Sequence, residues 1–259
     1  MKKIWITSLI ESEEAVGKII QQTRQYGIEA NGHFWKNDLE KFLWQDIQNE
    51  LLNPQIDLWL IFANKTDWEN SETRYGLSML SILIQSRKRL DFPIVILQND
   101  NNDIQPNTLP TPFRNVTIMS TSNPGYAAKL VAKLHAPVTK QSLEYRLDVQ
   151  GNIQVGQWFE IGPTAGEWDG VILGVEKSIS SIEFHATGPK GRLPEKATLN
   201  YPIKDMELSY NNKKYTAWAV KNKLTDNDSY YVKVKGYSGS MVFGHYADDA
   251  YLDLFVVRF

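Results

Sequence analysis

Hydrophobic and polar positions follow two different patterns along the 259 residues of the chain. Up to about residue 137, short apolar runs alternate with longer segments of helical period, which is typical of a parallel sheet covered by helices. From Leu143 onward, apolar residues recur at every second position between clusters of Gly, Pro, Asn and Asp, which is typical of antiparallel strands. The sequence therefore predicts two domains, residues 1–137 and 143–259, with the linker in 135–142.

In the first half, five apolar runs are expected to form strands: 3–8, 31–35, 56–63, 92–98 and 115–120. The runs at 56–63 and 92–98 are apolar on both faces, as a sheet covered on both sides requires. Segments of helical period predict helices at about 11–26, 38–52, 69–87 and 122–134, and the polar segment 99–114 is expected to be a surface loop. These elements predict a flavodoxin-like five-stranded α/β domain.

In the second half, about ten short strand patterns predict an antiparallel β-sandwich or barrel. One of them covers residues 197–203, and another contains Tyr230 and Tyr231. Consecutive residues of a strand point to opposite faces, so one of these two tyrosines is expected on an outer face or at an interface. An exposed aromatic surface would suit a sugar, a nucleotide or a partner protein.

Charge and cysteine content narrow the classes of function. Lys and Arg number 28 against 30 Asp and Glu, so bulk charge gives no reason to expect nucleic acid as a partner. Cysteine is absent, which removes thiolate chemistry and fits a cytoplasmic protein. No apolar run approaches the roughly 20 residues that a membrane-spanning helix needs, so no membrane association is expected.

Several common motifs are missing. The turn after the first strand has no GxGxxG, no GxxxxGK[ST] occurs, and the four histidines are scattered singly, so no metal site is predicted. The segment GYSGS at 236–240 is better read as a tight turn than as a nucleophile elbow, because no helical pattern follows it. The Gly-rich stretches 162–170 and 186–194 could shape an anion or sugar site, but hairpin turns use the same residues and are the better interpretation of both.

In open parallel sheets, ligands bind beyond the carboxyl ends of the strands. The polar or aromatic residues at those positions are therefore candidate binding residues. In chain order they are Thr7 with Ser8, Phe34 with Trp35, the segment 64–72, Gln98 with Asn99, and 120–122.

The stretch IDLWLIFANKTDWENSE, together with the five-strand pattern, resembles a Toll/interleukin-1 receptor (TIR) domain over residues 1 to about 135. Members of that family carry a W-C-x-x-E pattern after strand three, and Trp68 and Glu72 fall on its Trp and Glu positions, with Glu69 in place of the cysteine. KIWITS would be the first strand and QYGIEANGHFW the approach to the second. The stretch RYGLSML also resembles, more distantly, the nucleoside deoxyribosyltransferases.

Both families cleave an N-glycosidic bond with a glutamate, so the resemblance implies an NAD-cleaving effector in which Glu72 is the catalytic carboxylate. NAD would then be the substrate, with no other cofactor. Ser8, Trp35, Asn64 and Trp68 are candidate substrate-binding residues. The β-rich half would be a recognition or assembly module that binds a protein partner or a second copy.

Two other interpretations fit the same residues. Glu69 and Glu72 at the start of a helix favour the helix dipole in any protein, and Trp68 can fix the loop to the core. The chain could then be a non-enzymatic scaffold, which predicts an exposed Glu72. Alternatively, it could be a binding protein whose β-rich half holds a carbohydrate or a nucleotide.

Overall fold

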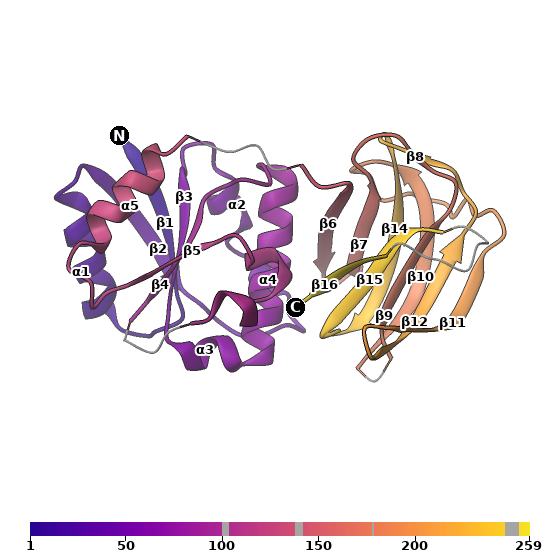
Figure 1. The fold of residues 1–259 in the computed structure, drawn as a ribbon, viewed down its shortest axis with the longest axis horizontal. Coiled ribbons are helices and arrows are strands. Elements are labelled where there is room, and N and C mark those ends of the chain that lie inside the picture. Colours follow the sequence, from indigo (N-terminus) through magenta and orange to yellow (C-terminus); the bar gives the residue numbers. More distant parts are fainter. Residues whose placement is uncertain (100–103, 138–141, 178, 247–253) are drawn as a thin grey trace. The chain divides into compact units, whose positions relative to one another are not determined.

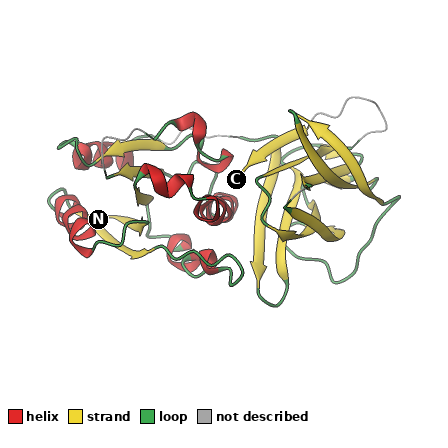
Figure 2. Cartoon of the chain, turned by 90° about the horizontal axis from the view of Figure 1, so that it is seen from below, coloured by secondary structure: helices red, strands yellow, loops and turns green. Residues whose placement is uncertain are grey.

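The computed structural model describes residues 1–99, 104–137, 142–177, 179–246 and 254–259 (Figure 1). The chain divides into two compact units, Met1–Gln141 and Ser142–Phe259. Figure 2 shows helices and strands in the first unit and strands in the second. Each unit is described by itself below.

The first unit is built on a five-stranded parallel sheet with the order β2-β1-β3-β4-β5. Its strands are β1 (Lys2–Ser8), β2 (Ile28–Phe34), β3 (Leu58–Ala63), β4 (Ile94–Gln98) and β5 (Thr117–Ser120). The predicted flavodoxin-like fold is thus confirmed. All six residues of β3 are buried, as its doubly apolar pattern predicts.

The helices of this unit are α1 (Glu13–Arg24), α2 (Gln48–Leu52), α3 (Lys65–Glu69), α4 (Ser71–Arg87) and α5 (Tyr126–His135). Short 3₁₀ turns lie at Leu43–Gln45, Pro106–Thr108 and Thr111–Phe113. The single helix predicted over 38–52 is wrong. Phe42 adopts a left-handed conformation with φ of 56°, which interrupts the helix, so only a 3₁₀ turn and α2 form there.

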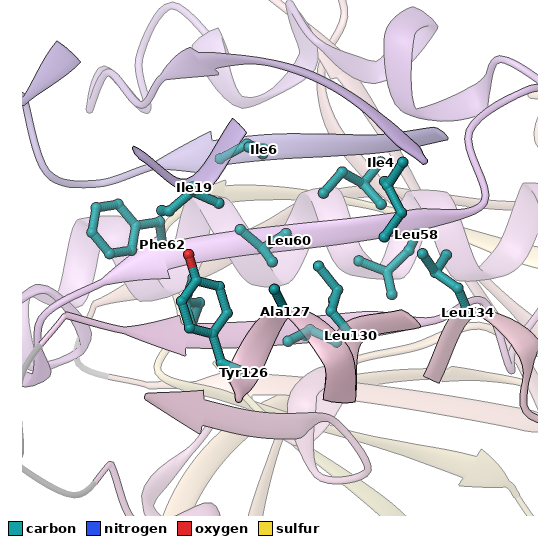
Figure 3. Packing of buried hydrophobic residues seen from close by; sticks show 13 residues of the cluster. Ile4, Ile6, Ile19, Leu58, Leu60, Phe62, Tyr126, Ala127, Leu130 and Leu134 are labelled. Atoms are coloured by element: carbon teal, nitrogen blue, oxygen red, sulfur yellow. The ribbon is translucent and has the colours of Figure 1, made fainter. Parts of the chain in front are cut away.

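One hydrophobic core of this unit lies between the sheet and the helices α1 and α5 (Figure 3). Ile4 and Leu60 from the strands meet Ile19 of α1 and Leu130 of α5, and all four side chains are almost fully buried. On α5, the buried positions Tyr126, Ala127, Leu130 and Leu134 recur every three or four residues. The opposite side of α5 is therefore left for other contacts.

The second unit contains two antiparallel sheets, with the orders β10-β14-β7-β6 and β11-β12-β9-β15-β16, and a short β13-β8 pair. The strands are β6 (Tyr145–Asn152), β7 (Gly156–Pro163), β8 (Glu167–Trp168), β9 (Val171–Glu176), β10 (Ser180–Pro189), β11 (Ile203–Tyr210), β12 (Lys213–Val220), β13 (Leu224–Thr225), β14 (Asp228–Gly236), β15 (Ser240–His245) and β16 (Leu254–Arg258). The predicted antiparallel β domain is confirmed.

Aromatic side chains join the two larger sheets face to face. Tyr145 on β6 packs against Phe243 on β15, with ring centroids 4.9 Å apart, and His185 on β10 packs against Trp218 on β12 at 4.7 Å. Tyr230 and Tyr231 are both fully buried, so the expectation that one of them lies exposed is wrong. Tyr231 is covered at the end of β10, where its hydroxyl donates to the carbonyl of Pro189 and accepts from the N–H of Arg192 in the turn that follows.

The strand predicted over 197–203 is also wrong, because residues 190–202 form a loop and β11 begins only at Ile203. Proline and lysine are frequent along this loop, and its middle is exposed. Among the described residues, no helix has both the length and the apolar character needed to cross a membrane.

Candidate functional site

Ser8, at the carboxyl end of β1, is buried within its own turn. Its hydroxyl donates to the carbonyl of Ile10 at 2.7 Å, and the next residue, Leu9, donates its N–H to Phe62 of β3. The helix α1 is capped instead by Ser12, whose Oγ accepts from the N–H of Ala15 at 3.2 Å. Ser8 could donate to a ligand only if this local hydrogen bond broke, although its oxygen could still accept.

Trp35 is linked to the start of α4 by a chain of hydrogen bonds. Its indole Nε1 donates to Asn37 Oδ1 at 2.7 Å, and Asn37 Nδ2 donates to Thr73 Oγ1 at 2.8 Å. A Cβ atom at Gly76 would lie 2.9 Å from the Trp35 ring, so helix and ring pack closely. The fold thus brings Trp35 to the helix turn that carries Glu72.

Asn64 is the N-cap of α3. Its backbone N–H donates to Asp67 Oδ2 at 2.7 Å, and its side chain accepts from the N–H of Asp67, which together form a capping box. The side chain of Asn99, after β4, reaches Asn64 Oδ1 at 3.4 Å. Asn64 and Asn99, two of the amide residues at the strand ends, are therefore in contact.

Trp68 is a buried residue with 6% of its surface exposed. Its ring meets the edge of Phe113 at 5.2 Å, and its Nε1 is buried without a hydrogen-bond partner among the described residues. Trp68 therefore fills the space after β3 with apolar surface.

Glu72 lies in the first turn of α4 and is exposed. Asn70 caps this helix through its Oδ1, which accepts from the N–H of Thr73 at 3.0 Å. Glu72 makes no hydrogen bond or ion pair with a described residue, and it lines neither of the two pockets described next. Its catalytic role, and substrate binding by Ser8, Trp35, Asn64 and Trp68, stay predictions.

The first unit contains a pocket of about 750 Å³ along β5. The strand-end residues Gln98 and Ser120 line it, together with all four residues of β5 and the exposed side of α5. The other lining residues are Ile104, Gln105, Pro106, Asn123, Tyr126, Lys129, Ala132, Lys133 and Ala136. The lysines were not among the candidates from sequence, although their spacing of four places them on one side of α5.

The second unit contains a pocket of about 560 Å³. It is lined by two segments, Thr187 to Thr198 and Asn222 to Asp228. The first segment includes part of the Gly-rich stretch that the sequence marks as either a turn or a sugar site. The charged residues that line the pocket are the basic Arg192, Lys196 and Lys223 and the acidic Glu195 and Asp228.

A buried polar network supports one rim of this second pocket. Ser229 Oγ donates to Glu160 Oε1 at 2.7 Å, and Arg146 Nη1 donates to Ser229 Oγ at 3.1 Å. Arg146 Nη1 also lies 3.9 Å from Glu160 Oε1, and Arg146 Nε donates to the carbonyl of Pro163. Burial lowers the pKa of Arg146, and the nearby negative charge of Glu160 opposes that shift.

The network holds the turn that follows β10. Glu160 Oε1 accepts from the N–H of Gly191 at 2.8 Å, and Tyr231 Oη accepts from the N–H of Arg192 at 3.0 Å while donating to Pro189. Gly191 has a φ of 75°, a conformation that glycine adopts without strain. The turn therefore has a fixed backbone although it lies at the surface.

The other rim is held in a similar way. The side chains of Thr187 and Asn222 both donate to the carbonyl of Thr198, the latter at 3.1 Å, and the N–H of Asn200 donates to Asn222 Oδ1 at 2.7 Å. Thr187 and Asn222 are each 9% exposed. Buried polar side chains thus fix both ends of the loop that surrounds the pocket.

His185 is a further buried polar residue of this unit, with 2% of its surface exposed. Its Nδ1 shares a hydrogen bond of 2.7 Å with the hydroxyl of Tyr230, and its Nε2 has no partner among the described residues. Burial, followed by the positive charge of Lys204, lowers the pKa of His185 from 6.5 to about 4. The imidazole is therefore neutral at physiological pH.

The described residues contain no group of three or more His, Asp or Glu that could hold a metal ion. The comparisons with known proteins give no family: no family model matches, and no curated protein matches. A two-domain esterase active on acetylated mannans, crystallised with mannopentaose, is 12% identical, with 99% of this chain and 89% of that chain covered. The TM-score of this structural match is 0.29, so the likeness supports no statement about the function of this chain.

Proposed function

We propose that this chain is a two-domain binding protein whose β-rich unit holds a carbohydrate in the pocket between residues 187–198 and 222–228. One observation carries the proposal: buried polar side chains fix both rims of this pocket. Burying charged and polar groups is costly unless they are well paired. Glu160, Arg146 and Ser229 form a network that holds one surface turn in a fixed conformation. Such a network pre-organises a binding site.

The chemistry of the lining residues favours a ligand rich in hydroxyl groups. A sugar hydroxyl both donates and accepts, and the pocket offers donors from Asn222 and Arg192 beside the acceptor carboxylates of Glu195 and Asp228. None of the twelve lining residues is aromatic, so the pocket provides no ring on which a nucleotide base or a sugar could stack, and a sugar would be held by hydrogen bonds. Pro189, Pro194 and Leu224 offer apolar contacts for the C–H groups of a sugar.

Charge points further to a sugar that carries a carboxylate. Arg192 is 3.5 Å from Glu195, and Lys223 forms an ion pair of 2.6 Å with Glu167. Lys196 makes no ion pair with a described residue. Its ammonium is therefore available to an anionic group of the ligand.

Isothermal titration with xylotriose, maltotriose and trigalacturonic acid tests this proposal. We expect trigalacturonic acid to bind most tightly and Lys196→Ala to weaken its binding several-fold, since exposed charge pairs contribute up to about 1 kcal/mol. Lys235→Ala is the matched control, because Lys235 is an exposed lysine of the same unit outside the pocket. If none of the three sugars binds at millimolar concentration, or if AMP binds better than all of them, carbohydrate binding is refuted.

A further inference from the structure

The outer edge of β5 pairs with no other described strand. β5 is the last strand in the sheet order and pairs with β4 alone among the described strands. The N–H of Thr121 donates to the carbonyl of Gln98 at 2.9 Å. In a parallel pair, every second residue of a strand bonds to the same neighbouring strand, so this bond shows which residues of β5 face β4. Thr117, Met119 and Thr121 therefore point their backbone groups toward β4. The N–H and C=O of Ile118 point away from the sheet.

A groove runs along this edge. One side of the groove is formed by Lys129, Ala132 and Lys133 of α5 and by Ala136, the residue that follows the helix. Ile104 to Pro106 and the four residues of β5 line the rest of the groove. The small side chains of Ala132 and Ala136 leave room for a polypeptide backbone beside the strand.

The two lysines give the groove a positive wall. Lys129 is exposed and Lys133 is half-buried, and neither makes an ion pair with a described residue. Four residues of α-helix advance about 6 Å along the axis. Two residues of a β-strand advance about 6.7 Å, and side chains two apart point to the same face. Acidic residues at positions i and i+2 of an added strand therefore match the spacing of the lysines.

We infer that the β5 groove binds an extended acidic peptide of a partner protein, which adds to β5 as a sixth strand. The backbone of Ile118 pairs with the peptide, and two acidic side chains on one face of the peptide meet Lys129 and Lys133. A four-residue edge about 13 Å long accommodates a segment of four to six residues. This site lies in a different unit from the proposed carbohydrate pocket and involves a different ligand, so either proposal can fail alone.

Fluorescence anisotropy with two labelled peptides of identical composition tests the inference on the full chain. Thr-Glu-Val-Glu-Val-Thr places both glutamates on one face of a strand, whereas Thr-Glu-Glu-Val-Val-Thr places them on opposite faces. We expect the first peptide to bind with a dissociation constant at least about fivefold lower, and its affinity to fall with added salt. Equal affinities, or no binding of either peptide at millimolar concentration, would overturn the inference.

Charge reversal locates the site. The double variant K129E/K133E is expected to bind the first peptide at least about tenfold more weakly, because it replaces two weak attractions by repulsions. Lys65→Glu is the matched control, since Lys65 is exposed on α3 and lies outside the groove. Undiminished binding by the double variant, confirmed as folded by circular dichroism, would place the peptide elsewhere. If the protein forms concentration-dependent dimers that dissociate when the peptide is added, the groove binds a second copy of this chain, and the inference of a separate partner protein is overturned.

Discussion

Acid should destabilise the β-rich unit through one residue, His185. Protonation of its imidazole would put a positive charge between two sheets, where the ring is 2% exposed, contacts Trp218 and Tyr230, and already faces the positive charge of Lys204. The folded-state pKa is about 4, and the unfolded value is 6.5. Between these values the unfolded chain binds more protons, so the free energy of unfolding rises with pH.

The size of the effect follows from the two pKa values. The contribution of the neutral His185 ring to the free energy of unfolding is complete well above pH 6.5 and is lost as pH falls through 6.5 toward 4. At 1.36 kcal/mol per pKa unit, a shift from 6.5 to about 4 corresponds to about 3 kcal/mol in full, of which about 2 kcal/mol is lost between pH 7.5 and pH 5. A loss of this size is a large fraction of the stability of an ordinary domain.

Urea titrations at pH 7.5 and pH 5, followed by the folded-state amide resonances of β10 and β14, measure this loss in the β-rich unit. His33 has a pKa lowered by burial to about 4 as well, but it lies on β2 in the other unit and does not affect these resonances directly. We expect His185→Gln to remove most of the pH dependence and His135→Gln, on exposed α5 surface, to leave it unchanged. Equal losses in wild type and His185→Gln, or a His185 ring that titrates near pH 6.5, would refute the reasoning.

Three further predictions concern the α/β unit. Lys88→Met should lower the free energy of unfolding by about 2 kcal/mol in a urea titration, because the Lys88 ammonium donates to three carbonyls, those of Leu51, Asn53 and Ile56; a loss below about 0.5 kcal/mol would show that water replaces it. Trp68→Ala should cost about 3 to 4 kcal/mol, since the ring packs against Phe113 in the core; a near-neutral result would fit a pocket wall instead. Nicotinamide release from NAD by the wild type and by Glu72→Gln tests the prediction that Glu72 is catalytic. Release by the wild type alone would establish the catalytic carboxylate and contradict a purely binding function, whereas no release by either protein is expected if the chain only binds its ligand.

The pattern of apolar residues was sufficient to predict the fold of both units. Strands buried on both faces, as in the first unit, are apolar throughout, whereas strands buried on one face, as in the second unit, alternate between apolar and polar residues. Errors arose where local conformation overrides the period. Phe42 in the left-handed region ends a helix that the apolar spacing of 38–52 would continue. The segment 197–203 has strand-like residues, yet the hydrogen bonds of Thr187 and Asn222 to Thr198 hold it as a loop.

The candidate sites were harder to predict than the fold. Two residues that the strand-end rule names, Gln98 and Ser120, line a pocket, and their role in binding stays a prediction. It could not identify Lys129 and Lys133, because a lysine pair on an exposed helix face has no distinctive sequence signal. In the network of Arg146, Glu160 and Ser229, the serine is 69 positions from Glu160 and 83 positions from Arg146 in the sequence. Pairing over such distances leaves no local sequence pattern.

The contact between Gly76 and Trp35 has a consequence for how sequences related to this one can vary. A Cβ at position 76 would lie 2.9 Å from the ring, so alanine there requires either a smaller side chain at position 35 or a shift of α4. A shift of α4 would also stretch the hydrogen bond from Asn37 to Thr73. Positions 35 and 76 should therefore change together during evolution, with a larger residue at 76 accompanied by loss of the tryptophan, and independent variation at the two positions would argue against this packing.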